Sequence, residues 1–146
     1  MTTKTFEDFL KLAVVRKVTS DPNRANSLYG ESHRKFKSLA ERIEKIGVRD
    51  ENANEYVEFC CDLLIQLLRA KMFLDGFIAT GQGAHEAEVA YMRNLRFGDY
   101  DLLFMDQLRY FRNGSLYYGT SLDAVYALKV ITFTKKMHPK FSKLVR

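Results

Sequence analysis

The stretch ENANEYVEFCCDLLIQLLRAKMFLDGFIA, residues 51–79, decides the fold of this 146-residue chain. Its apolar side chains form two adjacent rows at helical spacing, so they cover most of the circumference of a helix. An apolar arc this wide is typical of a helix that packs against neighbours on several sides. The polar residues are confined to one stripe, made of Glu55, Glu58, Asp62, Gln66 and Arg69. We therefore predict a central helix from Glu51 to Ala79.

Shorter amphipathic segments lie on both sides of this helix. Asp21-Pro22 is a helix start, with Asp as the N-cap and Pro at the first helical position. No segment alternates as a strand would, and we expect Gly81-Gln82-Gly83 to be a flexible joint. The flanking helices are predicted at Thr5–Val18, Pro22–Ile46, His85–Leu95, Tyr100–Asn113, and from Leu122 to just before His138-Pro139. The fold class expected is all-α, an antiparallel up-and-down bundle of five to six helices, forming one domain over residues 1–146.

Composition points to a globular protein of the cytoplasm. The chain is 47% hydrophobic and 28% charged, and no apolar run approaches the roughly 20 residues of a membrane helix. Glu7 and Asp8 stand where a signal peptide would be apolar, so we expect no signal peptide. Cys60 and Cys61 are adjacent, which fits buried thiols in a reducing compartment. We expect a cytoplasmic protein without contact to a membrane.

The sequence gives no sign of a metal site or of a cofactor. His33, His85 and His138 are far apart, and each lacks a second ligand at helical spacing. Gly81-Gln82-Gly83 lacks the Lys and Ser/Thr of a nucleotide-triphosphate loop. We therefore expect neither a bound metal nor a cofactor.

One segment, residues 109–119, combines cations with tyrosines. Arg109 and Arg112 are three residues apart, Asn113-Gly114 is turn-prone, and Tyr117 and Tyr118 follow. Arg grips phosphate bidentately and stacks on aromatic rings, so this cluster could hold RNA or a nucleotide. The same residues could equally lock two helices or two subunits together. Residues 107–146 carry eight Lys or Arg and one acidic residue, a balance that attracts phosphate or simply keeps a surface solvated.

In this segment the chain resembles the HEPN domain superfamily, in particular its small prokaryotic stand-alone members. The resemblance rests on the run from Leu108 to Gly119, which reads LRYFRNGSLYYG, followed by a final helix. It extends upstream through the central helix and the connection to His85, and covers residues 50–135 most closely. The family motif is an Arg, usually followed by a polar residue such as Asn, and then a His four to six residues after the Arg. Arg112 and Asn113 match this motif, but Tyr117 stands at the His position.

The resemblance implies a helical bundle that forms a homodimer with the Arg-Asn motif near the subunit interface. It also implies a metal-independent endoribonuclease, in some members a toxin paired with a nucleotidyltransferase-type partner protein. Histidine exchanges protons near neutral pH, whereas a tyrosine with a pKa near 10 does not without a large shift. The Tyr at position 117 therefore favours a non-catalytic HEPN-like module over an enzyme.

Three hypotheses remain open from the sequence. In the first, the protein binds RNA, a nucleotide or a partner protein, with Arg109, Arg112, Asn113, Tyr117 and Tyr118 as binding residues. In the second, it is an endoribonuclease or toxin with Arg112, Asn113 and Tyr117 as catalytic candidates. In the third, it has no ligand, and Arg112 pairs internally with a carboxylate such as Asp106 or Glu55.

Overall fold

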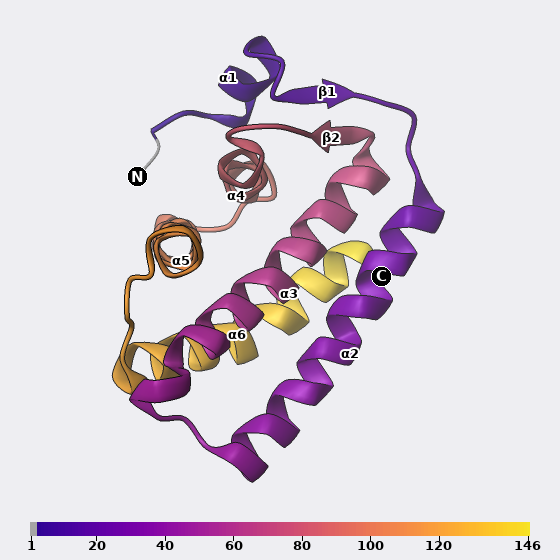
Figure 1. Ribbon diagram of the computed structural model, residues 1–146. Coiled ribbons are helices and arrows are strands. Elements are labelled where there is room, and N and C mark those ends of the chain that lie inside the picture. Colours follow the sequence, from indigo (N-terminus) through magenta and orange to yellow (C-terminus); the bar gives the residue numbers. More distant parts are fainter. Residues whose placement is uncertain (1–2) are drawn as a thin grey trace.

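The central helix α3 organises the computed structural model, which describes residues 3–146 (Figure 1). It runs from Ala53 to Asp75, and 13 of its 23 residues are buried. The elements around it are α1 (Phe6–Lys11), β1 (Val15–Lys17), α2 (Pro22–Ile46), the short 3-10 turn η1 (Asp50–Asn52), β2 (Phe77–Ala79), α4 (Ala84–Asn94), α5 (Asp99–Tyr118) and α6 (Ala124–Val145).

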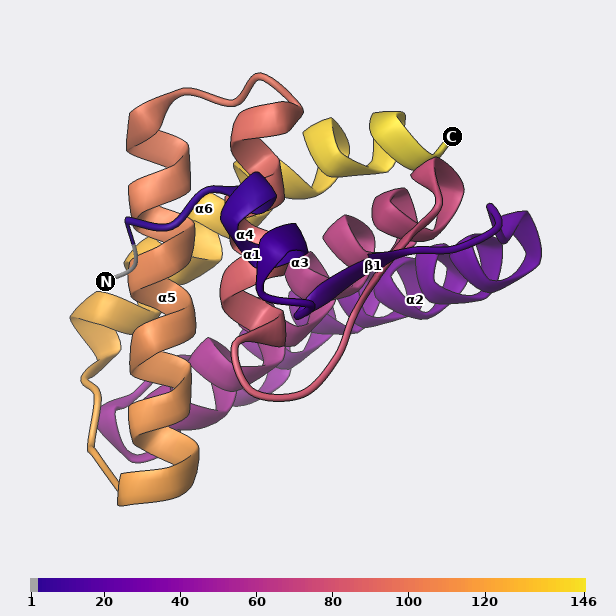
Figure 2. The ribbon, with the colours of Figure 1, turned by 90° about the horizontal axis from the view of Figure 1, so that it is seen from above.

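The long helices cover α3 from several sides. Helix α2 runs antiparallel to α3, and α6 lies along another of its faces (Figure 1). Helices α4 and α5 form a second antiparallel pair, seen end-on in Figure 1 and side-on in Figure 2, which crosses α3 steeply. The described chain is therefore an all-α helical bundle, as the sequence predicts.

The core consists of the two apolar rows of α3 and the side chains that meet them. Leu39 of α2, Leu108 of α5 and Met137 of α6 all pack fully buried into the same cluster as Leu63 and Leu64. A smaller cluster joins α1 to α4, where the rings of Phe6 and Tyr91 lie 4.5 Å apart. Burial of large apolar side chains on all sides of α3 supplies the main stabilisation of the fold.

Several helix boundaries are where the sequence places them. The Asp21 side chain accepts a hydrogen bond of 3.0 Å from the Arg24 backbone, and α2 ends at Ile46 with Gly47 after it. Helix α4 falls within one residue of its predicted range. Capping signals read from sequence were thus reliable, because they depend only on neighbouring residues.

The prediction that the chain has no strands is wrong. The first helix ends at Lys11 rather than Val18, and α3 ends at Asp75 rather than Ala79, so that residues 15–17 and 77–79 pair as two antiparallel strands. Gly76 makes this reversal possible. Its φ is +83°, and a Cβ there would lie 2.7 Å from the carbonyl oxygen of Val18.

Two helices extend further than predicted. Helix α5 continues through Asn113-Gly114 to Tyr118 and ends at Gly119, whose φ is +66°. Helix α6 passes through His138-Pro139 to Val145. Tertiary contact overrides the local signal in α6, because Phe141 is buried in the core beyond the proline. Within residues 3–146, no helix has both the length and the hydropathy that crossing a bilayer requires.

His138 is buried between α6 and α2. Its ring stacks on Phe36 with centroids 3.9 Å apart, and its Nε2 atom has no hydrogen-bond partner in the described chain. Burial, together with the nearby His33, lowers the pKa of His138 from 6.5 to about 4. The folded protein therefore resists protonation of a group that the unfolded chain protonates readily.

This difference predicts a specific loss of stability in mild acid. The unfolded chain binds a proton at His138 below pH 6.5, whereas the folded chain does so only near pH 4, so stability falls as the pH drops through that window. We expect the free energy of unfolding to fall between pH 7 and pH 4.5 by about 2 kcal/mol more in the wild type than in His138→Phe. Urea denaturation at both pH values measures this difference. An equal loss in the two proteins would contradict it.

Candidate functional site

The five residues singled out by sequence do not form one cluster. Arg109 is buried against Asp106, whose Oδ1 atom accepts from the Nε and Nη2 atoms of Arg109, both at 2.9 Å. Both side chains are less than a tenth exposed. The guanidinium of Arg109 is therefore bound to a carboxylate inside the protein. Asp106 pairs with Arg109 rather than with Arg112.

Tyr117 and Tyr118 lie on the last turn of α5 and are 70% and 85% exposed. In an α-helix, positions five apart point about 140° away from each other. Tyr117 therefore does not face the same way as Arg112. Asn113 lies next to Arg112 and accepts a weak hydrogen bond of 3.4 Å from its Nη1 atom.

Arg112 turns toward α3. Its Nη2 atom donates to Oδ1 of Asp62 at 2.9 Å, and its side chain is 16% exposed. The Nε atom is buried and has no hydrogen-bond partner in the described chain. The internal pairing considered from sequence thus occurs, but with Asp62 instead of Asp106 or Glu55, and it leaves part of the guanidinium unused.

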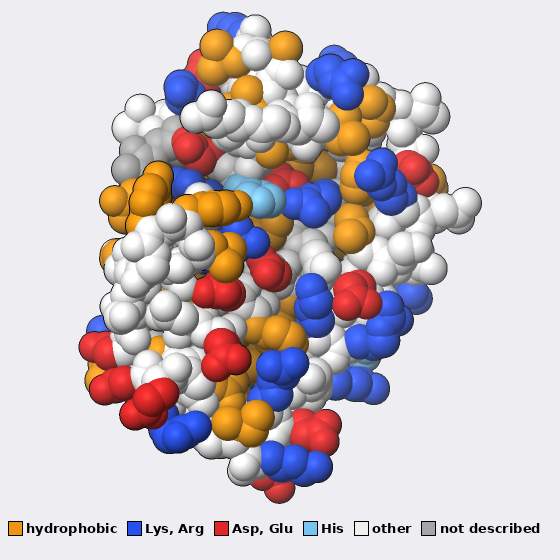
Figure 3. All heavy atoms as spheres, in the orientation of Figure 1, with side chains coloured by type: hydrophobic (Ala, Val, Ile, Leu, Met, Phe, Trp, Pro, Cys, Tyr) orange, Lys and Arg blue, Asp and Glu red, His pale blue; other side chains and the backbone are white. Residues whose placement is uncertain are grey.

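Arg112 lines a polar pocket of about 280 Å³ between four helices. In Figure 3, basic, acidic and histidine side chains gather where α4 lies over α3. We call the pocket the α2–α5 pocket, because each of the helices α2, α3, α4 and α5 contributes to its lining. Its polar lining is Lys35 from α2, Asp62, Gln66 and Arg69 from α3, His85 from α4 and Arg112 from α5.

Glu88 is buried behind one wall of the pocket and contacts two of the side chains that line it, Arg69 and His85. Its side chain is 1% exposed, and its carboxylate accepts from Nε of Arg69 at 2.6 Å. Burial opposes the charge on Arg69, but the hydrogen bond and the charge of Glu88 outweigh burial and raise the pKa of Arg69. Arg69 is therefore held as a cation in a fixed position.

The same carboxylate orients His85. The Nδ1 atom of His85 lies 2.7 Å from Oε1 of Glu88. Because a carboxylate accepts hydrogen bonds, Nδ1 is the donor, and Nε2 is the ring nitrogen left for another partner. The imidazole is thus fixed at the edge of the pocket with one nitrogen available.

Two polar atoms in the pocket wall are buried without partners in residues 3–146, namely Nε of Arg112 and Oε1 of Gln66. A buried polar group without a hydrogen bond costs about 1–3 kcal/mol, so proteins rarely leave one without a reason. One of these atoms is a donor and the other is an acceptor. A ligand with an anionic oxygen and a neighbouring N–H or O–H group would satisfy both.

The most important pocket residues were not recognised from sequence as site residues. Asp62, Gln66 and Arg69 lie on the polar stripe predicted for the central helix, but the stripe alone does not indicate a pocket. His85 was set aside because no second ligand was recognised near it. The usable signals were the His85-x-x-Glu88 spacing, which puts both side chains on one face of α4, and the polar stripe on an otherwise apolar helix.

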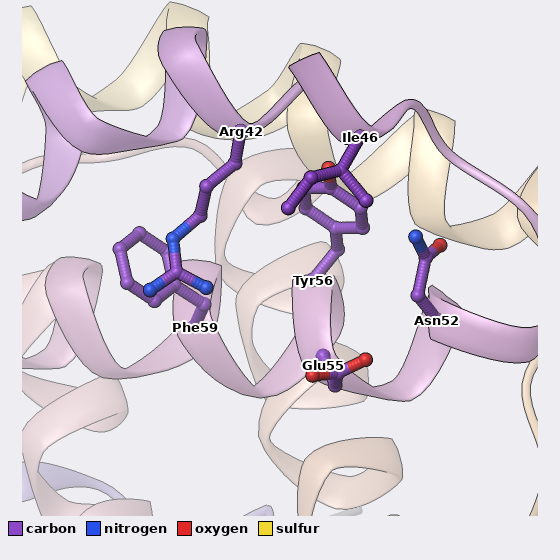
Figure 4. A pocket seen from close by; sticks show the side chains of 6 residues that line it. All are labelled: Arg42, Ile46, Asn52, Glu55, Tyr56 and Phe59. Carbon is purple, nitrogen blue, oxygen red and sulfur yellow. The ribbon is translucent and has the colours of Figure 1, made fainter. Parts of the chain in front are cut away.

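A smaller cleft at the other end of α3 does not compete with this pocket. It holds about 40 Å³ between α2 and α3, room for a water molecule or so. Figure 4 shows Arg42 lying over the ring of Phe59, with a distance of 4.7 Å to the ring centroid. The Tyr56 hydroxyl donates to the Gly47 carbonyl at 3.0 Å. These side chains hold the α2–α3 connection together.

The α2–α5 pocket is lined and supported by charged side chains of both signs. It brings the cations of Lys35, Arg69 and Arg112 together with the carboxylates of Asp62 and Glu88. No group of three or more His, Cys, Asp or Glu side chains in the described chain is arranged to hold a metal ion. Burial raises the pKa of Cys60 to about 11, so this thiol is no nucleophile near neutral pH.

The buried pair on α5 yields a test of Arg109 as a structural residue. Removing one partner leaves the other charge buried and uncompensated. We expect Asp106→Asn to lower the free energy of unfolding by about 3 kcal/mol, and Arg109→Met to lower it similarly. The double variant should recover part of this loss in urea denaturation. Additive losses in the double variant would show that the pair is not coupled.

Comparison of the chain with family models, with curated proteins and with solved structures finds no match.

Proposed function

We propose that this protein is a HEPN-like binding module that holds a phosphate group of RNA or of a nucleotide in the α2–α5 pocket. The observation that carries the proposal is the convergence of Lys35, Arg69 and Arg112, from three different helices, on one pocket. Arginine presents a planar fork of donors that matches phosphate oxygens, and lysine adds a point charge.

Two details favour a nucleotide unit over a simple anion. The unused Nε of Arg112 is a donor suited to a phosphate oxygen. The unused Oε1 of Gln66 is an acceptor, which the oxygens of a phosphodiester cannot satisfy because they carry no proton. A ribose hydroxyl or a base N–H next to the phosphate supplies the missing donor.

Asp62 acts against the ligand in this proposal. Its carboxylate occupies one edge of the Arg112 guanidinium at 2.9 Å and adds negative charge to the pocket. A phosphate must therefore share or displace this contact. Tyr117 and Tyr118 do not line the pocket, so the proposal does not depend on them.

The first test compares pocket variants with a matched surface variant. We expect Arg112→Gln to weaken binding of a 5′-phosphorylated tetraribonucleotide about tenfold or more, because charge-assisted hydrogen bonds are lost. Lys35→Gln should also weaken binding. The control is Arg34→Gln, which removes an exposed cation next to Lys35 in the sequence. Arg34 pairs with Glu31 and does not line the pocket. Asp62→Asn should strengthen binding severalfold, since it frees Arg112.

Isothermal titration calorimetry with the tetranucleotide, with adenosine monophosphate and with inorganic phosphate separates the sources of the phosphate. Tight binding of the mononucleotide alone identifies a nucleotide site, whereas stronger and more salt-sensitive binding of the oligonucleotide identifies RNA. Binding that is equal in the wild type and in Arg112→Gln would refute the proposal.

Metal-independent RNA cleavage is a second candidate, and the position of His85 favours it. Tyr117 leaves the sequence motif without a histidine, but the pocket beside Arg112 contains one from α4. Nε2 of His85 would take the proton of a ribose 2′-hydroxyl as its oxygen bonds to the neighbouring phosphorus. The bond from phosphorus to the 5′-oxygen then breaks, and that oxygen takes up a proton from water, while the imidazolium of His85 returns its proton to solvent. The products are a 2′,3′-cyclic phosphate and a 5′-hydroxyl.

Cleavage is tested with a fluorescent single-stranded RNA in the presence of EDTA. If the candidate holds, His85→Gln lowers the cleavage rate at least about a hundredfold, because a general base contributes about that much. Tyr117→Phe should leave the rate unchanged. No cleavage by the folded wild type at high enzyme concentration removes this candidate and leaves the binding proposal intact.

The homodimer, the nucleotidyltransferase-type partner and the toxin role implied by the resemblance stay predictions.

A further inference from the structure

Large side chains of α5 and of the first half of α6 line one groove. Tyr100, Phe104 and Phe111 come from α5, and Tyr126, Leu128 and Phe133 come from α6. Phe104 stacks on Phe133 with centroids 4.2 Å apart, and Phe111 meets Tyr126 edge-on at 5.2 Å. Residues later in α5 thus pair with residues earlier in α6, at the place where the two helices cross (Figures 1 and 2).

These side chains form an open groove of about 700 Å³, which we call the α5–α6 groove. The stacked aromatic pairs are its floor. Its edges stand in solvent, with Tyr100 72% exposed and Leu128 51% exposed. From Tyr100 to Phe111 the groove follows about 16 Å of α5, or three helical turns.

The exposed apolar surface continues beyond the groove. Leu103 and Tyr110 of α5 and Val125 of α6 are each more than half exposed. Single apolar residues on a surface are ordinary, but several of them beside an open aromatic groove mark an interaction site. Its helical spacing on both walls matches the way amphipathic helices are bound in grooves.

The rim of the groove carries lysines. Lys136 lies over the Tyr100 ring and pairs with Asp101 at 2.8 Å, which neutralises Asp101. Lys129 lines the groove without an ion-pair partner in the described chain. The exposed Lys135 and Lys140 add further positive charge to α6. A partner that fits this rim carries carboxylates.

We propose that the α5–α6 groove binds an amphipathic helix of another protein, with apolar side chains inserted into the groove and an Asp or Glu paired with Lys129. A second copy of the chain fits less well, because two such grooves would set lysines against lysines. The groove is separate from the α2–α5 pocket, and this proposal does not depend on phosphate binding.

The test uses two synthetic 18-residue helical peptides with identical Leu and Phe positions. One carries Glu beside the apolar stripe, and the other carries Lys at the same places. Fluorescence polarisation at low salt should show binding of the Glu peptide and at least roughly tenfold weaker binding of the Lys peptide. Lys129→Glu should weaken the Glu peptide about fivefold, and Leu128→Glu should weaken it roughly tenfold.

Ile46→Glu is the matched control, since Ile46 is as exposed as the groove residues but lies at the end of α2. Circular dichroism verifies that each variant is folded. Equal binding of the two peptides, or binding of neither, overturns the proposal. Sedimentation that shows a dimer lost in Leu128→Glu also overturns it, because the groove would then belong to a second copy.

Discussion

The structure depends on the burial of α3 on nearly all sides. A helix with 13 buried residues cannot rest on one neighbour, so α2, α5 and α6 each take a separate face of it. The connections follow from this requirement. The tight turn at Gly76 and the two short strands return the chain across the top of the bundle, and α4 and α5 then cross α3 instead of running along it (Figures 1 and 2). The crossing pair leaves the polar stripe of α3 beneath it.

That polar stripe accounts for the candidate site. Charged groups between packed helices must find partners, because an unpaired buried charge is costly. Ser115 donates to Glu58, Arg112 pairs with Asp62, and Glu88 pairs with Arg69. The network is satisfied along most of its length, and the two buried atoms without partners belong to Arg112 and Gln66, which line the pocket. Polar residues that only joined helices would not need the open volume that these residues surround.

Helix α5 borders both surfaces on which proposals are made. Arg112 faces α3 and the α2–α5 pocket, whereas the neighbouring Phe111 faces α6 and the aromatic groove. Adjacent residues of a helix point about 100° apart, so one helix serves two surfaces without sharing side chains between them. Phosphate binding and peptide binding can therefore be altered separately by substitution.

The sequence by itself determined the all-α class, the central helix and the capped limits of α2. These features depend on local spacing and on neighbouring residues, which are visible along the chain. Only the tertiary structure decided that Arg109 is buried against Asp106 and that Arg112 pairs with Asp62. It also decided that His85 lines the same pocket as Arg112. The Arg112–Asp62 pair and the position of His85 link different helices, so their geometry depends on the angle at which α4 and α5 cross α3. Asp106 and Arg109 are three residues apart on α5, and only the packing around them shows that the pair is buried. The continuation of α6 past Pro139 has the same cause, since the core contact of Phe141 outweighs the local preference of the proline.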